Sequence, residues 1–417
     1  MHAKFAQSIW PATPSGILER VRIDRLVLTP NASMDAALAA DPYLNNNDGR
    51  WAVYGDNPEA YAATFGTTVD YGLIHEISHQ LGLIDVYQYD VEGPANTVWS
   101  DGAPALFEHV ASQHGMMRNH GDTNYSEFSS LALNSQLSRR RGYYGDFQFL
   151  TPRTNILRVL DVNSNALAGA TIECFRRGTD GYFSNAFVVC SGTTDVNGCF
   201  VLPSSGGGYA TSNGYALAPH PFGFLDVVGG NILLARIRKH DAEFWYWFEC
   251  IAANIAYWRG QSNTALYTIA TRIANDAALA PPRAVSAQQT GDSVTLGWLP
   301  PAGTVSAYRI YTGDVRPYDA PMTLHSQVVG TNAVVTRNSQ RRYATVAAVY
   351  ADGREGSAAP LMYLPNLPAY STPPGVERYV AGIAMLSNEQ RLVCIARGGE
   401  EQPIWQRPNG AFVGMFS

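Results

Sequence analysis

The segment TVDYGLIHEISHQLGLID, residues 68–85, carries the first clear secondary-structure signal of this chain. Thr68 at its start suits a helix N-cap, and Gly82 near its end suits the left-handed residue that terminates a helix. Four apolar residues between them recur at every fourth position, namely Val69, Leu73, Ile77 and Leu81. Because that spacing is typical of one face of an α-helix, we predict a helix over residues 69–81.

The same segment carries a pattern of metal ligands. His75 and His79 are one helical turn apart, so both imidazoles can reach one ion, while Glu76 lies beside them. A chain reversal at Gly82 can bring Asp85 back as a third ligand and leave a fourth position for water. The pattern predicts an open zinc site. The alternative is an amphipathic helix whose histidines only pack, which would bury polar groups without a cation.

Residues 75–85 resemble the zinc signature of the metzincin clan of metallopeptidases, HExxHxxGxxH/D, in the variant with an aspartate as third ligand. The resemblance implies zinc as cofactor and a protein or peptide as substrate, with Glu76 as the general base of peptide-bond hydrolysis. It also implies a tight turn with a methionine beneath the metal. The sequence Gly-Met-Met-Arg at 115–118 offers Met117 for that position, with Met116 as its rival.

Several positions depart from that family pattern. Some metzincins have a tyrosine two residues after the turn methionine, where this chain has Asn119. Tyr125 or Tyr87 is the candidate for an oxyanion donor, and packing is the alternative role of each. A gluzincin-type site would instead take Glu108 as its third ligand, but it would leave the Gly-x-x-Asp continuation of the motif unexplained.

Two functions outside catalysis compete with the endopeptidase hypothesis. One is a non-catalytic cell-surface adhesion protein whose zinc site survives as a structural clip or a vestige. The other is a regulatory binding protein whose first part is an inactive remnant. Glu76 favours the enzyme, because a closed structural site needs no base and usually fills its fourth position with a protein ligand.

After residue 152 the helical spacing gives way to strand-like alternation broken by turns. Residues 156–203, with a turn at Asp195, resemble a carboxypeptidase-regulatory-like or transthyretin-like β-sandwich, and residues 283–364, with Trp298, resemble a fibronectin type III module. We therefore expect a multidomain chain. Its predicted parts are an α+β metzincin-like catalytic domain over 1–151, a β-sandwich with an extension over 152–280, a fibronectin type III-like domain over 281–365 and a short β-rich segment, an incomplete domain, over 366–417.

Local patterns inside these parts give further expectations. Helices are predicted over residues 104–113 and 126–141. The aromatic run at residues 244–248 is interpreted as core and interdomain packing, because neighbours in a strand point to opposite faces. A platform for a sugar ring is the alternative, and contact of the β-modules with a cell surface or a polysaccharide is the corresponding expectation about partners.

Composition restricts the partners and the location. The chain has 417 residues and a net charge of −6, and it shows no basic stripe for nucleic acid. It also lacks the roughly 18 uninterrupted apolar residues of a membrane span. No export signal is visible, and only about seventy residues precede the predicted helix. We expect a secreted or cell-surface protein whose catalytic domain is truncated at its start.

Five cysteines occur, and none belongs to a CxxC pair. An odd number leaves at least one thiol free or paired between chains. The spacing also excludes a zinc site built from cysteines. The cysteines are Cys174, Cys190, Cys199, Cys250 and Cys394.

Overall fold

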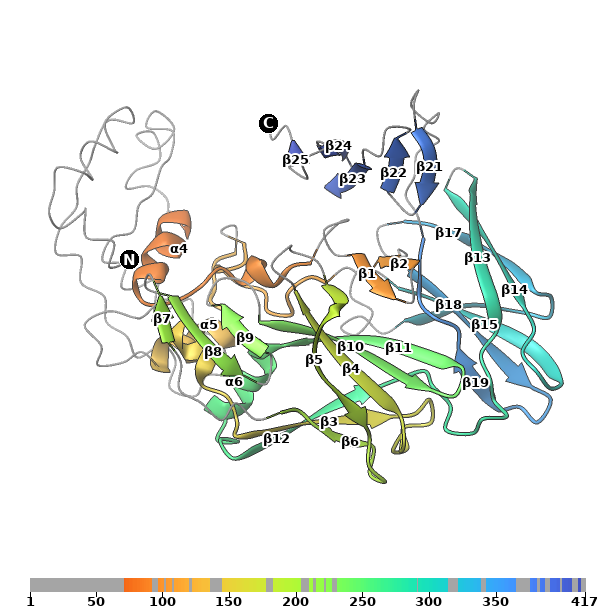
Figure 1. The fold of residues 1–417 in the computed structure, drawn as a ribbon, viewed down its shortest axis with the longest axis horizontal. Coiled ribbons are helices and arrows are strands. Elements are labelled where there is room, and N and C mark those ends of the chain that lie inside the picture. Colours follow the sequence, from red (N-terminus) through yellow and green to blue (C-terminus); the bar gives the residue numbers. More distant parts are fainter. Residues whose placement is uncertain are drawn as a thin grey trace, which may run out of the picture.

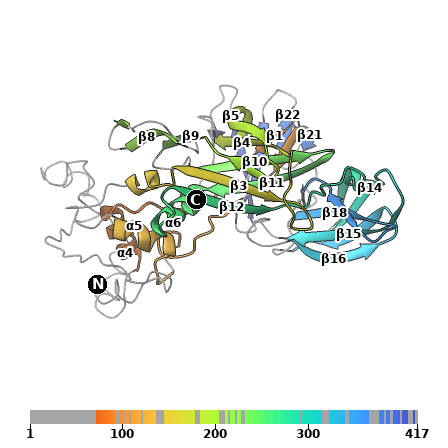
Figure 2. The same ribbon diagram turned by 90° about the horizontal axis from the view of Figure 1, so that it is seen from below.

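The computed structural model describes most of the chain between residues 71 and 413. Within the described ranges the chain is mostly β and multidomain, with a few short helices (Figure 1; Figure 2). None of the described helices has the length and apolar character needed to cross a lipid bilayer. The described ranges are 71–91, 97–100, 103–106, 109–119, 122–135, 145–177, 183–203, 210–212, 215–220, 223–226, 231–290, 292–313, 322–338, 343–364, 376–380, 383–386, 391–397, 400–406 and 412–413.

Two of the predicted helices are confirmed. Helix α4 (Tyr71–Gln80) lies inside the first predicted range, and α5 (Glu127–Ser135) lies inside the third. The Ser126 hydroxyl accepts a hydrogen bond from the Ser129 amide at 3.1 Å, so Ser126 is the N-cap of α5. Residues 136–144, which include the arginines expected at the end of that helix, lie outside the described residues.

The helix predicted over residues 104–113 is wrong. Its first residues form strand β2 (Ala103–Leu106), which pairs antiparallel with β1 (Thr97–Ser100). Farther along, His109 forms a β-bridge with Val91. Pairing with neighbouring segments therefore overrides the local helical pattern.

The first sandwich is built from two sheets. Strand order is β11-β10-β4-β5-β1-β2 in the larger sheet and β12-β3-β6 in the smaller one. Since β1 pairs with β5 at Trp99 and Ser184, the region before residue 151 adds two strands to this sandwich. A separate sheet has the order β7-β8-β9. The strand bounds are β3 (Thr154–Leu160), β4 (Thr171–Arg177), β5 (Phe183–Thr193), β6 (Cys199–Val201), β7 (Ala210–Ser212), β8 (Tyr215–His220), β9 (Gly223–Asp226), β10 (Ile232–Lys239), β11 (Ala242–Glu249) and β12 (Thr264–Ala270).

A helix interrupts the region that the sequence predicts to be entirely β. Helix α6 (Cys250–Trp258) follows β11 directly, and its Asn254 amide donates to the carbonyls of Phe147, Gln148 and Leu150 at 3.2, 3.1 and 2.9 Å. These contacts hold the 3-10 helix η4 (Asp146–Phe149) against α6. A short apolar run does not distinguish a buried helix from a buried strand, which explains the error.

One hydrophobic cluster extends across position 151, where the sequence predicts a domain boundary. It contains Ile74 and Phe128 before that position and Leu157 and Ile251 after it. The Phe128, Phe147 and Trp258 rings meet inside it, with centroids 5.4 to 6.0 Å apart. The helical part and the first sandwich therefore share one core.

Residues 283–364 form a fibronectin type III-like β-sandwich. The sheet β13-β14-β17 packs against β16-β15-β18-β19, with β20 beside β18. Trp298 is buried between the sheets with its ring 5.2 Å from Tyr308, as expected for the tryptophan of this fold. The strands are β13 (Arg283–Thr290), β14 (Ser293–Leu299), β15 (Val305–Gly313), β16 (Thr323–Val328), β17 (Asn332–Thr336), β18 (Tyr343–Tyr350), β19 (Glu355–Ala358) and β20 (Met362–Tyr363).

The C-terminal segment contains strands, as predicted. They pair as one antiparallel sheet in chain order, β21-β22-β23-β24-β25. Their bounds are β21 (Val376–Val380), β22 (Ile383–Leu386), β23 (Arg391–Arg397), β24 (Glu400–Gln406) and β25 (Phe412–Val413).

Two cysteines of the first sandwich lie directly opposite each other. Cys174 on β4 pairs with Cys190 on β5, and both are free thiols. The Cys190 thiol and burial raise the pKa of Cys174, whereas the hydrogen bond with Cys174 lowers the pKa of Cys190. Directly opposed residues of antiparallel strands have the Cα separation that a disulfide requires. Cys190, which is partly exposed, is therefore the better nucleophile of the pair.

We expect oxidised glutathione to join Cys174 and Cys190. The Cys190 thiolate attacks one glutathione sulfur and releases one glutathione thiolate, and Cys174 then displaces the second while losing its proton to solvent. Thiol titration in denaturant should show a loss of two thiols from the five in the sequence. Cys190→Ser should abolish that loss and Cys199→Ser should not. An unchanged thiol count in the parent chain would contradict the prediction.

Candidate metal centre

The end of α4 returns the chain toward the two histidines. Gly82 has a φ of 98°, in the left-handed region that favours glycine. Its amide donates to the His79 carbonyl at 3.0 Å, and the Leu83 amide donates to the Ser78 carbonyl at 3.1 Å. These two bonds form a Schellman motif, which is the helix end that the sequence predicts at Gly82.

The reversal brings Asp85 to both imidazoles. Asp85 Oδ1 lies 2.9 Å from His75 Nε2 and 3.3 Å from His79 Nε2. One ligand atom from each of the three residues lies within 4.8 Å of the other two. The side chains are 7%, 18% and 13% exposed for His75, His79 and Asp85, so the cluster is largely shielded from solvent.

The other nitrogen of each ring is held by a backbone carbonyl. His75 Nδ1 lies 2.7 Å from the Met116 carbonyl oxygen, and His79 Nδ1 lies 2.9 Å from that of Leu83. A carbonyl can only accept, so each Nδ1 carries the proton and donates it. In the neutral rings, both Nε2 atoms then direct lone pairs toward the cluster, which is the orientation of metal-binding imidazoles.

This arrangement joins three electron-pair donors. Burial raises the pKa of Asp85, but His75 and His79, which donate hydrogen bonds to its carboxylate when their rings are protonated, the charge that His79 then carries and a hydrogen bond from Tyr87 hold that pKa well below its ordinary value. Asp85 therefore presents a carboxylate oxygen to two imidazole nitrogens. Three such atoms repel one another unless a proton or a metal cation lies among them.

The two tyrosines considered as oxyanion donors have different environments. Tyr125 is buried, and its hydroxyl lies 2.6 Å from Ser78 Oγ, so it packs against α4 from the core side. Burial raises the pKa of the Tyr125 hydroxyl above its ordinary value. Tyr87 is 48% exposed, belongs to the 3-10 helix η2 (Val86–Tyr89) and interacts with Asp85. Only Tyr87 has the exposure that contact with a substrate requires.

A tight turn at residues 115–119 carries the backbone carbonyl that contacts His75. The amides of Arg118 and Asn119 donate to the Gly115 carbonyl at 2.8 and 3.0 Å, and Gly115 has a φ of 138°. A Cβ at Gly115 would lie 2.6 Å from the Ser126 amide nitrogen, so the turn requires glycine.

Both methionines of that turn are buried, and both contribute backbone contacts near the cluster. The Met116 carbonyl binds His75, whereas the Met117 carbonyl accepts from the Val86 amide at 2.8 Å. Of the two methionines, Met116 is thus the one whose backbone contacts a candidate metal ligand, His75. The choice of Met117 as the family's turn methionine stays a prediction.

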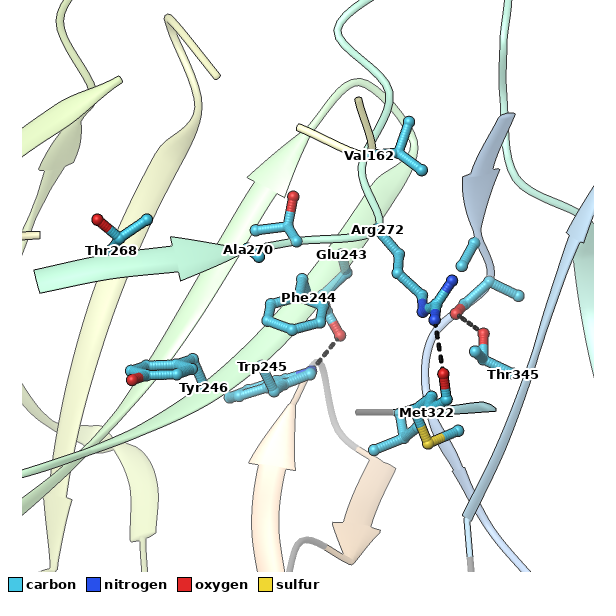
Figure 3. Close-up of a pocket in the computed structure, with 14 residues that line it drawn as sticks. Val162, Glu243, Phe244, Trp245, Tyr246, Thr268, Ala270, Arg272, Met322 and Thr345 are labelled. Carbon is cyan, nitrogen blue, oxygen red and sulfur yellow. Dashed lines mark hydrogen bonds between the residues drawn. The ribbon is translucent and has the colours of Figure 1, made fainter. Parts of the chain in front are cut away.

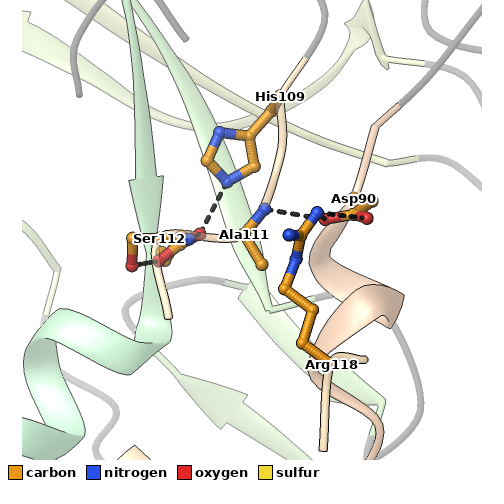
Figure 4. A network of polar contacts seen from close by, with 6 residues as sticks. Asp90, His109, Ala111, Ser112 and Arg118 are labelled. Carbon is orange, nitrogen blue, oxygen red and sulfur yellow. Dashed lines mark hydrogen bonds and ion pairs between the residues drawn. The ribbon is translucent and has the colours of Figure 1, made fainter. Parts of the chain in front are cut away.

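A buried polar network holds the loop that leads to this turn (Figure 4). Glu249, at the end of β11, accepts from the Ser112 amide at 2.9 Å, and its Oε1 lies 2.6 Å from His109 Nε2. The Ser112 hydroxyl donates to the other oxygen of Glu249. Beside it, Asp90 binds Arg118 at 3.0 Å and the Ala111 amide at 2.7 Å. No sequence signal links Glu249 to a loop 137 residues earlier.

Some predicted site residues are not placed in side-chain detail. The backbone of Glu76 belongs to α4, one position after His75, and its side chain is not among those described. Glu108, the third ligand of the gluzincin alternative, lies outside the described residues, as do residues 1–70. Of the predicted site residues, the structure brings together His75, His79 and Asp85. The helix end at Gly82 and the turn with Met116 and Met117 lie next to them.

No protein-family model matches the chain, and no curated protein is detectably similar to it. Solved structures are similar only in part. A Fn3-like protein from Clostridium thermocellum is 23% identical, with 22% of this chain and 98% of that chain covered and a TM-score of 0.19. A human fibronectin type III domain is 18% identical, with coverages of 25% and 89% and a TM-score of 0.20.

An enzyme also occurs among these structures. Pectate lyase PelI from Erwinia chrysanthemi is 16% identical, with 20% of this chain and 28% of that chain covered and a TM-score of 0.18. This chain thus spans less than a third of that enzyme's length.

Proposed function

We propose that this chain is a zinc-dependent endopeptidase whose metal is held by His75, His79 and Asp85, in a metzincin-like catalytic domain. The observation that carries the proposal is the convergence of these three ligand atoms within 4.8 Å, with both Nδ1 protons engaged by carbonyls. Two imidazoles and a carboxylate are suitable zinc ligands, and three protein ligands with an open position are typical of catalytic rather than structural zinc.

A bound zinc ion would supply a Lewis acid that activates water and polarises the carbonyl of a peptide bond. The residues of the chain perform the remaining tasks. The carbonyls of Met116 and Leu83 fix the tautomer and orientation of His75 and His79. Glu76, one position after His75, accepts a proton from the attacking water and delivers it to the leaving amine. Tyr87, exposed beside Asp85, is the candidate for contact with the substrate's oxyanion.

Zinc binding by the full chain tests the ligand set. We expect one zinc ion per molecule by elemental mass spectrometry, together with cleavage of denatured casein that a chelator abolishes. His79→Ala should weaken zinc binding by about 100-fold, because it removes one of three ligands. His114→Ala is the matched control, since His114 is exposed and lies outside the cluster.

Two results would contradict the proposal. Equal zinc binding by the parent chain and His79→Ala would show that the metal lies elsewhere. Stoichiometric zinc at His75, His79 and Asp85 without cleavage of any unfolded protein would favour the structural clip of an adhesion protein.

A further inference from the structure

A cavity of about 400 Å³ lies between the first sandwich and the fibronectin type III-like module (Figure 3). Phe244, Trp245 and Tyr246 of β11 line one side of it together with Thr268 of β12, and Arg272 and Thr345 lie toward the other side. Its volume is in the range of small-molecule sites. Helix α4 lies at the end of the first sandwich that points away from the fibronectin type III-like module (Figure 1; Figure 2).

Hydrogen bonds between the two modules fix the walls of this cavity. The Ala358 amide donates to the Arg272 carbonyl at 2.8 Å, and the Ala274 amide donates to Ser357 Oγ at 2.8 Å. The Arg272 guanidinium donates to the Met322 carbonyl at 2.9 Å. A site whose walls are already fixed loses little conformational entropy when a ligand binds.

The aromatic side of the cavity has a defined arrangement. Phe244 and Tyr246 are two residues apart on β11, so they project from the same face, and both are only partly buried. The neighbouring Trp247 is buried, as the packing interpretation of the aromatic run predicts. Phe244 and Tyr246 therefore present apolar ring surface to the cavity, beside the exposed Thr268 on β12.

The charged residues of the cavity are already neutralised. Arg272 lies over the Tyr311 ring at 3.7 Å and has Glu355 within 3.8 Å. Glu243 accepts from Trp245 Nε1 at 2.6 Å and lies 4.0 Å from Arg236. Among the described residues that line the cavity, each charged side chain thus has an opposite charge within 4.0 Å, which favours a neutral ligand over a charged one.

We propose that this cavity binds a neutral pyranose unit of a glycan. A pyranose with equatorial hydroxyls has an apolar face of C–H groups, which stacks on aromatic rings such as Phe244 and Tyr246. Its rim of hydroxyls can exchange hydrogen bonds with the Thr268 hydroxyl and accept from the Arg272 guanidinium. This site does not depend on the metal centre.

Calorimetric titration of the full chain with methyl β-D-glucopyranoside and with cellohexaose tests the proposal. Binding of both sugars with equal affinity indicates a site for one unit, and tighter binding of cellohexaose indicates a site along a chain; either supports the proposal. Tyr246→Ala should weaken binding about tenfold, because it removes a stacking ring. Ala270→Trp should fill the cavity from an exposed position of β12 and weaken binding by at least as much.

Thr264→Trp is the matched control, because Thr264 is exposed on the same strand and does not line the cavity. It should bind the sugars as the parent chain does. The absence of binding to both sugars would overturn the proposal, as would unchanged affinity in Ala270→Trp. Binding of N-acetyl-tryptophanamide without binding of either sugar would overturn it in favour of a peptide site.

Discussion

Replacing Glu76 by glutamine is expected to lower kcat for hydrolysis of an unfolded protein by about 10²–10⁴-fold, the usual contribution of a general base. Glutamine has nearly the same size and shape, but its amide cannot accept a proton from water at neutral pH. Glu76 belongs to α4 directly after His75, and the ligand set proposed for the zinc consists of His75, His79 and Asp85 without it. The variant should therefore still bind one zinc ion.

Glu76→Asp provides a graded control for this result. It keeps a carboxylate but withdraws it by one methylene, so kcat should lie between those of the parent chain and Glu76→Gln. Zinc content by elemental mass spectrometry and initial rates of casein cleavage should be measured on the same samples. Loss of zinc from Glu76→Gln would make Glu76 a ligand, and unchanged hydrolysis would place the base elsewhere.

The convergence of His75, His79 and Asp85 was predictable from the sequence, because all three residues belong to one local unit. The i, i+4 spacing places His75 and His79 on one turn, and the left-handed Gly82 returns the chain so that Asp85 follows within a few residues. Such geometry depends on backbone preferences that are readable over a dozen residues. The carbonyl of Met116 is different, because it reaches His75 from 41 residues away, and only the family resemblance indicated a turn there.

Long-range pairing is where prediction from sequence fails. Residues 103–106 form a strand because β1 is available to pair with them, and residues 250–258 form a helix because α5 and η4 pack against it. The Trp298 strand of the fibronectin type III-like module was predictable, since its alternation is strict and its core is local to the module. The core shared across position 151 has no such local pattern.

Glu249 illustrates the energetic consequence of that long-range packing. Glu249→Ala is expected to lower the free energy of unfolding by about 3–5 kcal/mol, the cost of removing one partner from a buried polar pair. His109 Nε2, the Ser112 amide and the Ser112 hydroxyl all lose their acceptor, and the His109 and Glu249 side chains are only 0% and 4% exposed. Urea denaturation followed by tryptophan fluorescence should show the lower midpoint.

Two further variants separate this network from a general effect of losing a carboxylate. Glu249→Gln keeps one acceptor oxygen and should destabilise less. Asp276→Ala removes an exposed carboxylate that pairs with Arg354 at 2.9 Å and accepts from the Ala278 amide at 2.9 Å, and it should lower the midpoint much less than Glu249→Ala. An unchanged midpoint for Glu249→Ala would mean that the network does not contribute to stability.

Glu249→Ala should also weaken zinc binding at the candidate metal centre. Ser112 is held by Glu249 and lies three residues before the turn at Gly115, whose next residue, Met116, orients His75. Loosening that loop releases the carbonyl that fixes the tautomer of His75, so we expect zinc affinity to fall by about tenfold or more, as for other outer-shell partners of metal-binding histidines. Zinc titration of Glu249→Ala in the absence of urea measures this coupling. Parent-like affinity in a destabilised variant would show that the metal centre is held without the loop, by α4 and the Gly82 turn alone.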